Sequence, residues 1–265
     1  MPVRPLRSVA GLEASVADQD LRIFFYVNQN CKNFPMFRYG CMWHVFINHG
    51  ESDKMFMTTN QFTAYDYGFV AGEAARDRLR RTLWDYDLDR RTLMIGRPQA
   101  DHFAGALPCT PDDRTVVLYA PTWEGDCDSA AYGSVVSHGE AIVAALLATG
   151  TYRVLYRPHP RSGVIDPEFK RANEAIIAAI VAANARDSSA QHVFDDVPGL
   201  GRQLASAEWS LPTESADIVA IAHRVQHDAE ARRRLDYWVD HHFGDTTPRE
   251  ATRRFHLAVD TLPAL

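Results

Sequence analysis

The sequence contains no hydrophobic run that approaches the roughly 20 residues needed to cross a bilayer as a helix. It has only four cysteines, Cys31, Cys41, Cys109 and Cys127, and none of them forms a Cys-x-x-Cys pair. No secretory signal opens the chain. These absences favour a cytoplasmic protein with reduced thiols, whose contact with a membrane, if it has any, is peripheral.

Strong positive charge and the common nucleotide-binding motifs are missing as well. The formal net charge is −6, so no long-range attraction to nucleic acid or to anionic lipid is expected from the total, although local basic clusters could still matter. The chain has no Gly-x-Gly-x-x-Gly, no Walker loop and no Gly-x-Ser-x-Gly. No cluster of ligand residues implies a metal site, because the adjacent His241 and His242 are poorly placed to share one ion.

What is present is the composition of a globular protein, with 46% hydrophobic and 23% charged residues in 265 positions. Runs typical of strands cover residues 21–27, 43–47, 65–71, 93–95, 115–119, 152–156 and 192–194. Helical patterns cover residues 73–84, 139–148 and 168–185. The β-branched run at 115–119 (TVVLY) is typical of a buried parallel strand. This alternation predicts α/β layering with parallel sheets.

A segment with little apolar periodicity, residues 101–113, is the candidate linker. The patterns on either side of it predict two Rossmann-like domains, residues 1–107 and 108–265. In open parallel sheets, ligands bind at the carboxyl ends of the strands. The residues that directly follow a predicted strand are His49, Gly96, Pro121 to Glu124, and His159.

The segment from His49 to Lys54 (HGESDK) gathers an imidazole, two carboxylates and an ammonium after a strand. Histidine suits proton transfer near neutral pH. Gly50 lets the backbone approach a ligand closely, and Lys54 could neutralise a phosphate. The alternative interpretation is a polar turn.

In Arg157-Pro158-His159-Pro160, two prolines hold the backbone rigid, so the cation and the imidazole are presented in fixed positions. Such a pair at a strand end suits a phosphate or a pyrophosphate. A stiff loop with a surface histidine is the alternative.

Residues 119–125 (YAPTWEG) form a second rigid strand end, stiffened by Pro121. Thr122 could bind a phosphate oxygen, and Glu124 adds a carboxylate. Trp123 could pack on a base or, as is more usual for tryptophan, on a neighbouring loop.

Two further stretches have a functional and a plainer interpretation. Residues 96–101 (GRPQAD), which include Arg97, suit either a loop that orders an interdomain cleft or a linker turn. The four arginines between positions 76 and 81 suit an acidic lipid or polyanionic acceptor, or simply a solvated helix face.

Taken together and in this order, these motifs resemble the CDP-glycerol glycerophosphotransferase family, which makes teichoic-acid-type polymers. The matching segments are HGESDK at 49–54, YDYGFVAG at 65–72, GRPQAD at 96–101, YAPTWEG at 119–125, YRPHPRSG at 156–163, FDD at 194–196 and FGDTTPREATRRF at 243–255. They extend from about Asn28 to Phe255.

The resemblance implies a GT-B-like fold, in which two Rossmann-like domains face a cleft. Residues 1–107 would be the acceptor-side domain with the catalytic histidine, and residues 108–265 the nucleotide-donor domain, with the last helix packing back on the first. The implied reaction moves glycerol phosphate from CDP-glycerol, or a similar CDP-polyol, to a polyol-phosphate, glycan or lipid-linked acceptor and releases CMP. The implied location is cytoplasmic and peripheral at the inner face of the cell membrane. No cofactor is implied, although a Mg²⁺ could enter with the diphosphate.

By position, the resemblance makes His49 the base that deprotonates the acceptor hydroxyl. His159 and Arg157 would hold the donor diphosphate, and Thr122 would line the donor site. The remaining expected residues are Gly50, Lys54 and Pro121 around the phosphates, with Asp53, Glu124, Arg97 and Asp196 in support.

The family's Asp-x-Ser-Ser-type phosphate loop has no counterpart after residues 194–196, so the second domain is expected to be shortened. The first domain is expected to be short as well, because the match to the family starts near its last strands. The missing phosphate loop favours an alternative, a donor-impaired and inactive family member that binds a polyanion or a partner. Another alternative is a GT-B glycosyltransferase that uses a nucleotide sugar. The pairing of His-Gly with Arg-Pro-His-Pro fits phosphotransfer better, because it places imidazole and cations at two strand ends.

Overall fold

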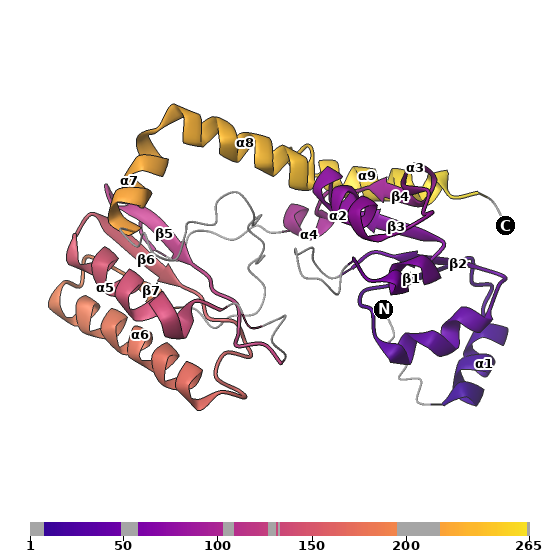
Figure 1. The fold of residues 1–265 in the computed structure, drawn as a ribbon, viewed down its shortest axis with the longest axis horizontal. Helices are drawn as coiled ribbons and strands as arrows, with labels where there is room; N and C mark the ends of the chain where they lie inside the picture. Colours follow the sequence, from indigo (N-terminus) through magenta and orange to yellow (C-terminus); the bar gives the residue numbers. More distant parts are fainter. Residues whose placement is uncertain are drawn as a thin grey trace. The chain divides into compact units, whose positions relative to one another are not determined.

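The computed structural model describes residues 8–48, 58–102, 109–126, 131, 133–194 and 218–263. The chain divides into two compact units: unit 1 is residues 1–102 with 236–265, and unit 2 is residues 103–235. Each unit contains one parallel sheet (Figure 1). The protein is therefore mixed α/β with parallel sheets, as the alternation of patterns predicts. The facing of two such domains across a cleft stays a prediction.

Unit 1 is built on a four-stranded sheet with the order β1-β2-β3-β4. Its strands are β1 (Ile23–Tyr26), β2 (Trp43–Phe46), β3 (Tyr67–Val70) and β4 (Thr92–Met94). The helical segments of this unit are α1 (Val9–Ala17), η1 (Cys31–Arg38), η3 (Asn60–Ala64), α2 (Glu73–Thr82), α3 (Leu88–Arg91), α4 (Pro98–Asp101) and α9 (Glu250–Thr261). The predicted strands and the helix at 73–84 are confirmed, whereas α1, η1, η3, α3 and α4 were not predicted.

The sheet of unit 1 is covered on both faces, because alternate residues of each strand point to opposite sides. Val45 and Phe69 pack with Phe255 of α9 on one face. Phe46 and Val70, the next residues along the same strands, belong to a second hydrophobic cluster on the other face. Residues 250–261 thus complete the core of a sheet that is built from the first hundred residues.

A buried histidine, His44, is held inside this core by two hydrogen bonds. Its Nδ1 lies 2.7 Å from the hydroxyl of Tyr26, and its Nε2 lies 2.8 Å from the carbonyl oxygen of Tyr39. A carbonyl only accepts, so Nε2 carries the proton and Nδ1 accepts from Tyr26. Burial, followed by the charges of Tyr65 and Asp66, raises the pKa of Tyr26 and keeps its hydroxyl a donor.

Unit 2 is built on a three-stranded sheet with the order β5-β6-β7. Its strands are β5 (Thr115–Tyr119), β6 (Tyr152–Tyr156) and β7 (Val193–Phe194), and its helical segments are η5 (Val135–Gly139), α5 (Glu140–Ala148), α6 (Pro167–Arg186) and α7 (Ile218–His227). Helix α8 (Ala229–Phe243) runs across the boundary between the two units in sequence. The strands and the helices α5 and α6 are those that the sequence predicts.

Helix α6 is set up by its own sequence. The Asp166 side chain accepts the N–H of Glu168, and Pro167 occupies the first turn, where no backbone donor is needed. Its buried stripe, at helical spacing, consists of Phe169, Ala172, Ile176, Ile180 and Ala183. This stripe packs with one face of the sheet, and Figure 1 shows α5 and α6 on that side.

The expectation that residues 115–119 form a buried strand is wrong for one face. β5 is the end strand in the described sheet order, and its burial alternates along the chain. Val117 and Tyr119 pack with the helices, whereas Val116 and Leu118 are 37% and 45% exposed. The β-branched composition predicts the strand, but burial of its second face depends on neighbours that composition does not specify.

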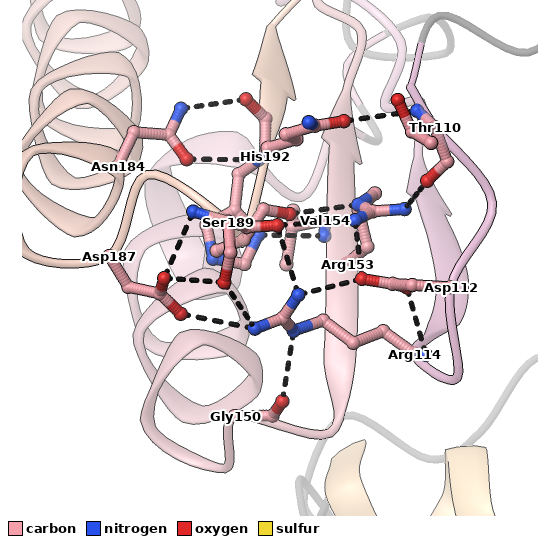
Figure 2. A network of polar contacts seen from close by, with 12 residues as sticks. Thr110, Asp112, Arg114, Gly150, Arg153, Val154, Asn184, Asp187, Ser189 and His192 are labelled. Carbon is pink, nitrogen blue, oxygen red and sulfur yellow. Dashed lines mark hydrogen bonds and ion pairs between the residues drawn. The ribbon is translucent and has the colours of Figure 1, made fainter.

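The amino ends of the strands in unit 2 are tied together by a polar network around Arg153 (Figure 2). The Arg153 side chain is only 1% exposed, and it donates to the carbonyl oxygens of Ala190 and Thr110 at 2.8 and 2.6 Å. Its Nη2 also lies 2.7 Å from the carboxylate of Asp112, which binds Arg114 at the same distance. Each of the three guanidinium nitrogens is thus hydrogen-bonded, as burial of the charge requires.

His192 closes this network beside β7. Its Nδ1 accepts the backbone N–H of Val154 at 3.1 Å, while Asn184 bonds both the N–H and the carbonyl of His192. Burial, followed by the charges of Arg114 and Arg153, lowers the pKa of His192. The neutral ring is therefore part of the scaffold at the edge opposite to the carboxyl ends of the strands.

Candidate functional site

The predicted base and its neighbours lie outside the described residues. These are His49, Gly50, Asp53 and Lys54, and the same holds for Asp196. Their roles stay predictions.

The residues that flank the His49 segment border a small cavity at the carboxyl end of β2. Asn48 has φ +56 and is 4% exposed, so the chain turns sharply there in a conformation that asparagine tolerates. The cavity holds about 20 Å³, room for a single water. It is lined by Phe46, Asn48, Thr58, Phe62, Phe69, Val70, Ala75, Arg78 and Leu79. Asn48 and Thr58, the described residues that bracket the His49 segment in the sequence, thus line one cavity together with Arg78.

In unit 2, β5 and β6 are neighbours, and their carboxyl ends lead into the two predicted loops. The N–H of Arg157 donates to the carbonyl oxygen of Tyr119 at 2.8 Å, which joins the start of the two loops. The Tyr119 and Tyr156 rings stack beneath them with centroids 5.6 Å apart. Arg157 is 4% exposed, so the structure places a buried cation where β6 ends.

The centre of the site is a stack of three side chains, in which His159 and Arg161 pack on Trp123. Trp123 is 7% exposed. The ring of His159 stacks on the indole with centroids 6.1 Å apart, and the guanidinium carbon of Arg161 lies 3.8 Å from the indole centroid. The Nδ1 of His159 accepts the N–H of Arg161 at 3.1 Å. This bond defines the neutral tautomer in which Nε2 carries the proton and is a donor.

Glu124 fixes the second loop onto the first. Its carboxylate accepts the backbone N–H groups of Gly163, Ile165 and Asp166 at 2.9, 2.9 and 3.3 Å. Burial opposes its ionisation, but the N–H groups of Ile165, of Glu124 itself, of Gly163 and of Asp166 outweigh burial and hold the pKa of Glu124 below its usual value. Glu124 is therefore a structural anchor of the site.

The loop that follows β6 needs glycine at position 163, one of the three positions whose N–H groups Glu124 binds. Gly163 has φ +75, and a Cβ placed there would lie 2.6 Å from the Cα of Lys170 in α6. The remaining residues of the first loop, Pro121 and Thr122, are partly exposed beside the Trp123 stack. The structure thus brings Pro121, Thr122 and Glu124 into the same edge of the sheet as Arg157 and His159.

Arg97 lies in unit 1, where its side chain packs on an aromatic ring of α8. Its guanidinium carbon is 5.7 Å from the centroid of the Phe243 ring. Asp101, the last residue of α4, accepts the N–H groups of Arg249 and Thr252 at 3.0 and 2.7 Å, at the start of α9. Residues 96–101 therefore hold the last helix onto the sheet of unit 1. Neither of the two interpretations of this segment, a loop that orders an interdomain cleft or a linker turn, predicts this contact.

One residue of the stack, Arg161, was missed by sequence reasoning. It follows His159 by two residues in the segment YRPHPRSG, and its charge was visible there. Its packing on Trp123 joins residues 38 positions apart, and the spacing of residues in the sequence does not predict such a contact.

Within the described ranges, no group of three or more His, Cys, Asp or Glu residues is placed to hold a metal ion. None of the helices in these ranges combines the length and the apolarity that a membrane span requires.

Comparisons with known proteins give little. No protein-family model matches the chain, and no curated protein matches it. A crystal structure of accessory secretory protein 1, 2 and 3 in Streptococcus pneumoniae is similar with a TM-score of 0.30 and 11% identity, over 64% of this chain and 34% of that one. The chain thus spans about a third of the length of that structure. A likeness at that level leaves the function to the residues themselves.

Proposed function

We propose that the chain is a GT-B-like transferase that moves a polyol phosphate from a CDP-activated donor, such as CDP-glycerol, to a polyol-phosphate or lipid-linked acceptor and releases CMP. The observation that carries the proposal is the arrangement at the carboxyl edge of the unit 2 sheet. There Arg157 and His159 follow one strand and Thr122 follows its neighbour. The motif resemblance supplies the substrate class.

This edge offers the groups that a diphosphate needs. Arg157 is a buried cation, and a charge removed from water interacts more strongly with an anion than an exposed one does. The Nε2–H of His159 and the hydroxyl of Thr122 add neutral donors. The stack on Trp123 and the bond from Arg161 hold the His159 ring in one orientation, so its donor needs no rearrangement when charge develops.

In the proposed reaction, the acceptor hydroxyl oxygen attacks the phosphorus of the glycerol phosphate group. The bond from that phosphorus to the oxygen bridging to CMP breaks, and CMP leaves with the bonding electron pair. The hydroxyl proton passes to His49, and negative charge grows on the CMP phosphate, where Arg157 and His159 would stabilise it. A Mg²⁺ ion would enter with the donor diphosphate.

The direct test incubates the full chain with CDP-glycerol and a short glycerol-phosphate acceptor, with and without Mg²⁺, and measures CMP by chromatography. Acceptor-dependent CMP release supports the proposal. No release and no donor binding by calorimetry would overturn it. Donor binding without release would instead identify an inactive family member, and turnover of a nucleotide sugar alone would identify a glycosyltransferase.

Variants assign the roles of the two histidines. His159→Ala should raise the donor dissociation constant roughly tenfold, the equivalent of one hydrogen bond to a charged group. His227→Ala, an exposed histidine of the same unit, is the matched control and should leave it unchanged. His49→Ala should lower kcat by about 10²–10⁴ with donor affinity retained. An equal loss of donor affinity would count against the base role.

A further inference from the structure

The turn between α2 and α3 presents one fully exposed tryptophan. Trp84 is 92% exposed, although burial of such a side chain would be favourable. Leu83 and Leu88, on either side of it, are 7% and 8% exposed and belong to the same hydrophobic cluster. The turn is therefore anchored at both ends, and the fold itself holds the indole outward.

Arginines lie on both sides of Trp84 in the sequence. The exposed ones are Arg80 and Arg81 at the end of α2, and Arg90 and Arg91 at the end of α3. An ion pair between Arg76 and Asp89 joins the two helices. Arg91 lies over the ring of Tyr86, two residues after Trp84, with its guanidinium carbon 5.5 Å from the ring centroid, so the end of α3 lies beside the turn that carries the indole.

The acidic residues of this region are mostly engaged in the fold. Asp77 pairs with Arg80 and with His241, and Asp89 pairs with Arg76. Asp87 caps α3 by accepting the N–H of Arg90, which leaves Asp85 in the exposed turn. Residues 73–91, the span of α2 and α3, contain six arginines and five acidic residues, of which Glu73 pairs with Arg76 and Arg80, a local net charge of +1 in a chain whose net charge is −6.

We propose that Trp84 and the surrounding arginines form a docking surface for an anionic lipid bilayer, with the indole in the interfacial region and the guanidinium groups on lipid phosphates. Tryptophan prefers the membrane–water interface, and arginine matches phosphate geometry. A soluble polyanion would use the arginines but gain little from an isolated indole. The inference stands independently of the proposed transferase activity.

The test is co-sedimentation of the full chain with vesicles of phosphatidylcholine and phosphatidylglycerol in equal parts, and with vesicles of phosphatidylcholine alone. Binding is expected to the mixed vesicles only. Trp84→Ala should lower the partition coefficient roughly tenfold or more. The triple variant Arg81→Ala, Arg90→Ala, Arg91→Ala should lower it about fivefold per charge removed.

Two matched controls make the result specific. Phe34→Ala removes an exposed aromatic, 49% exposed, from elsewhere in unit 1. A second triple variant, Arg232→Ala, Arg233→Ala, Arg234→Ala, removes an equal number of charges from α8. Both should bind the mixed vesicles like the wild type. All variants change exposed side chains, so circular dichroism should show an unchanged fold.

Three outcomes would overturn the inference. Equal binding by the wild type and Trp84→Ala would remove the indole from the surface. Equal losses in the two triple variants would show only general electrostatic attraction. Binding of soluble polyphosphate as tight as that of the vesicles, and insensitive to Trp84→Ala, would assign the arginines to a soluble polyanion.

Discussion

Replacing Glu124 by glutamine tests whether the site is held by one carboxylate. The carboxylate accepts three backbone N–H groups from residues 163–166, two of them at 2.9 Å. Glutamine keeps the shape but has one acceptor oxygen and one NH₂ group. At least one backbone donor would then face another donor.

The expected loss follows from the hydrogen bonds. A bond to a charged acceptor contributes about 1.5–3 kcal/mol and a neutral one about 0.5–1.5, so loss of charge on two short bonds removes roughly 1 kcal/mol each. The unmatched donor adds about 1 kcal/mol. Glu124→Gln should therefore lower the free energy of unfolding by roughly 2–3 kcal/mol at pH 7.

Urea unfolding measures this loss, with Glu174→Gln as the matched control. Glu174 lies on α6 and is 61% exposed in an ion pair with Lys170 at 3.9 Å, so its change should be within about 0.5 kcal/mol. Acrylamide quenching of Trp123, measured in a background in which the other four tryptophans are phenylalanine, should rise in Glu124→Gln, because the loop that carries Arg161 loses its anchor. A stability loss below 0.5 kcal/mol, with unchanged quenching, would refute the anchoring role.

The same variant has a defined pH signature. The folded-state pKa of Glu124 is lowered, so its contribution is fully present above the ordinary glutamate pKa of about 4.5 and is lost as pH falls through the folded value. The stability difference between wild type and Glu124→Gln should therefore shrink below about pH 4.5. A difference that stays constant as the pH falls well below about 4.5 would contradict the carboxylate's role.

Three further changes test the scaffold by urea unfolding. Arg153→Met should cost about 3 kcal/mol, because two buried carbonyls and an aspartate lose their partner; a loss within error would show that the network is dispensable. His192→Asn keeps an acceptor for the Val154 N–H but cannot titrate. The wild type should lose stability as pH falls from about 6.5 through the lowered pKa of His192, and the variant should lack this component. Tyr26→Phe should cost about 1–2 kcal/mol, since His44 is left with a buried acceptor and no donor, and an unchanged midpoint would count against that bond.

The fold was largely predictable because parallel strands are recognisable in a sequence as short apolar runs between turn residues. The runs at 43–47 and 152–156 correspond to β2 and β6 with boundaries that differ by at most one residue. The helix α1 and the 3₁₀ segment η1 escaped prediction, because neither has a strong apolar stripe. α1 has no buried residue, and η1 contains Pro35.

The site was predictable only in part. The rule that ligands bind at the carboxyl ends of strands selected the residues after β5 and β6, and the pairing of these strands brings both loops together. The partners within the site were not predictable, because they join positions far apart. Glu124 binds N–H groups about 40 residues away, and Asp101 binds those of Arg249 and Thr252 about 150 residues away.

These two carboxylates change what the motifs mean. Glu124 belongs to YAPTWEG and Asp101 to GRPQAD, yet both bind backbone N–H groups and serve the scaffold. A chain under selection for its fold alone would keep both residues, and with them part of the resemblance. Motif residues that the scaffold does not need are therefore the ones that can distinguish an active enzyme from a protein that shares only the fold. His49→Ala and His159→Ala, measured for turnover and for donor affinity, bear on the proposed chemistry more directly than any further motif match.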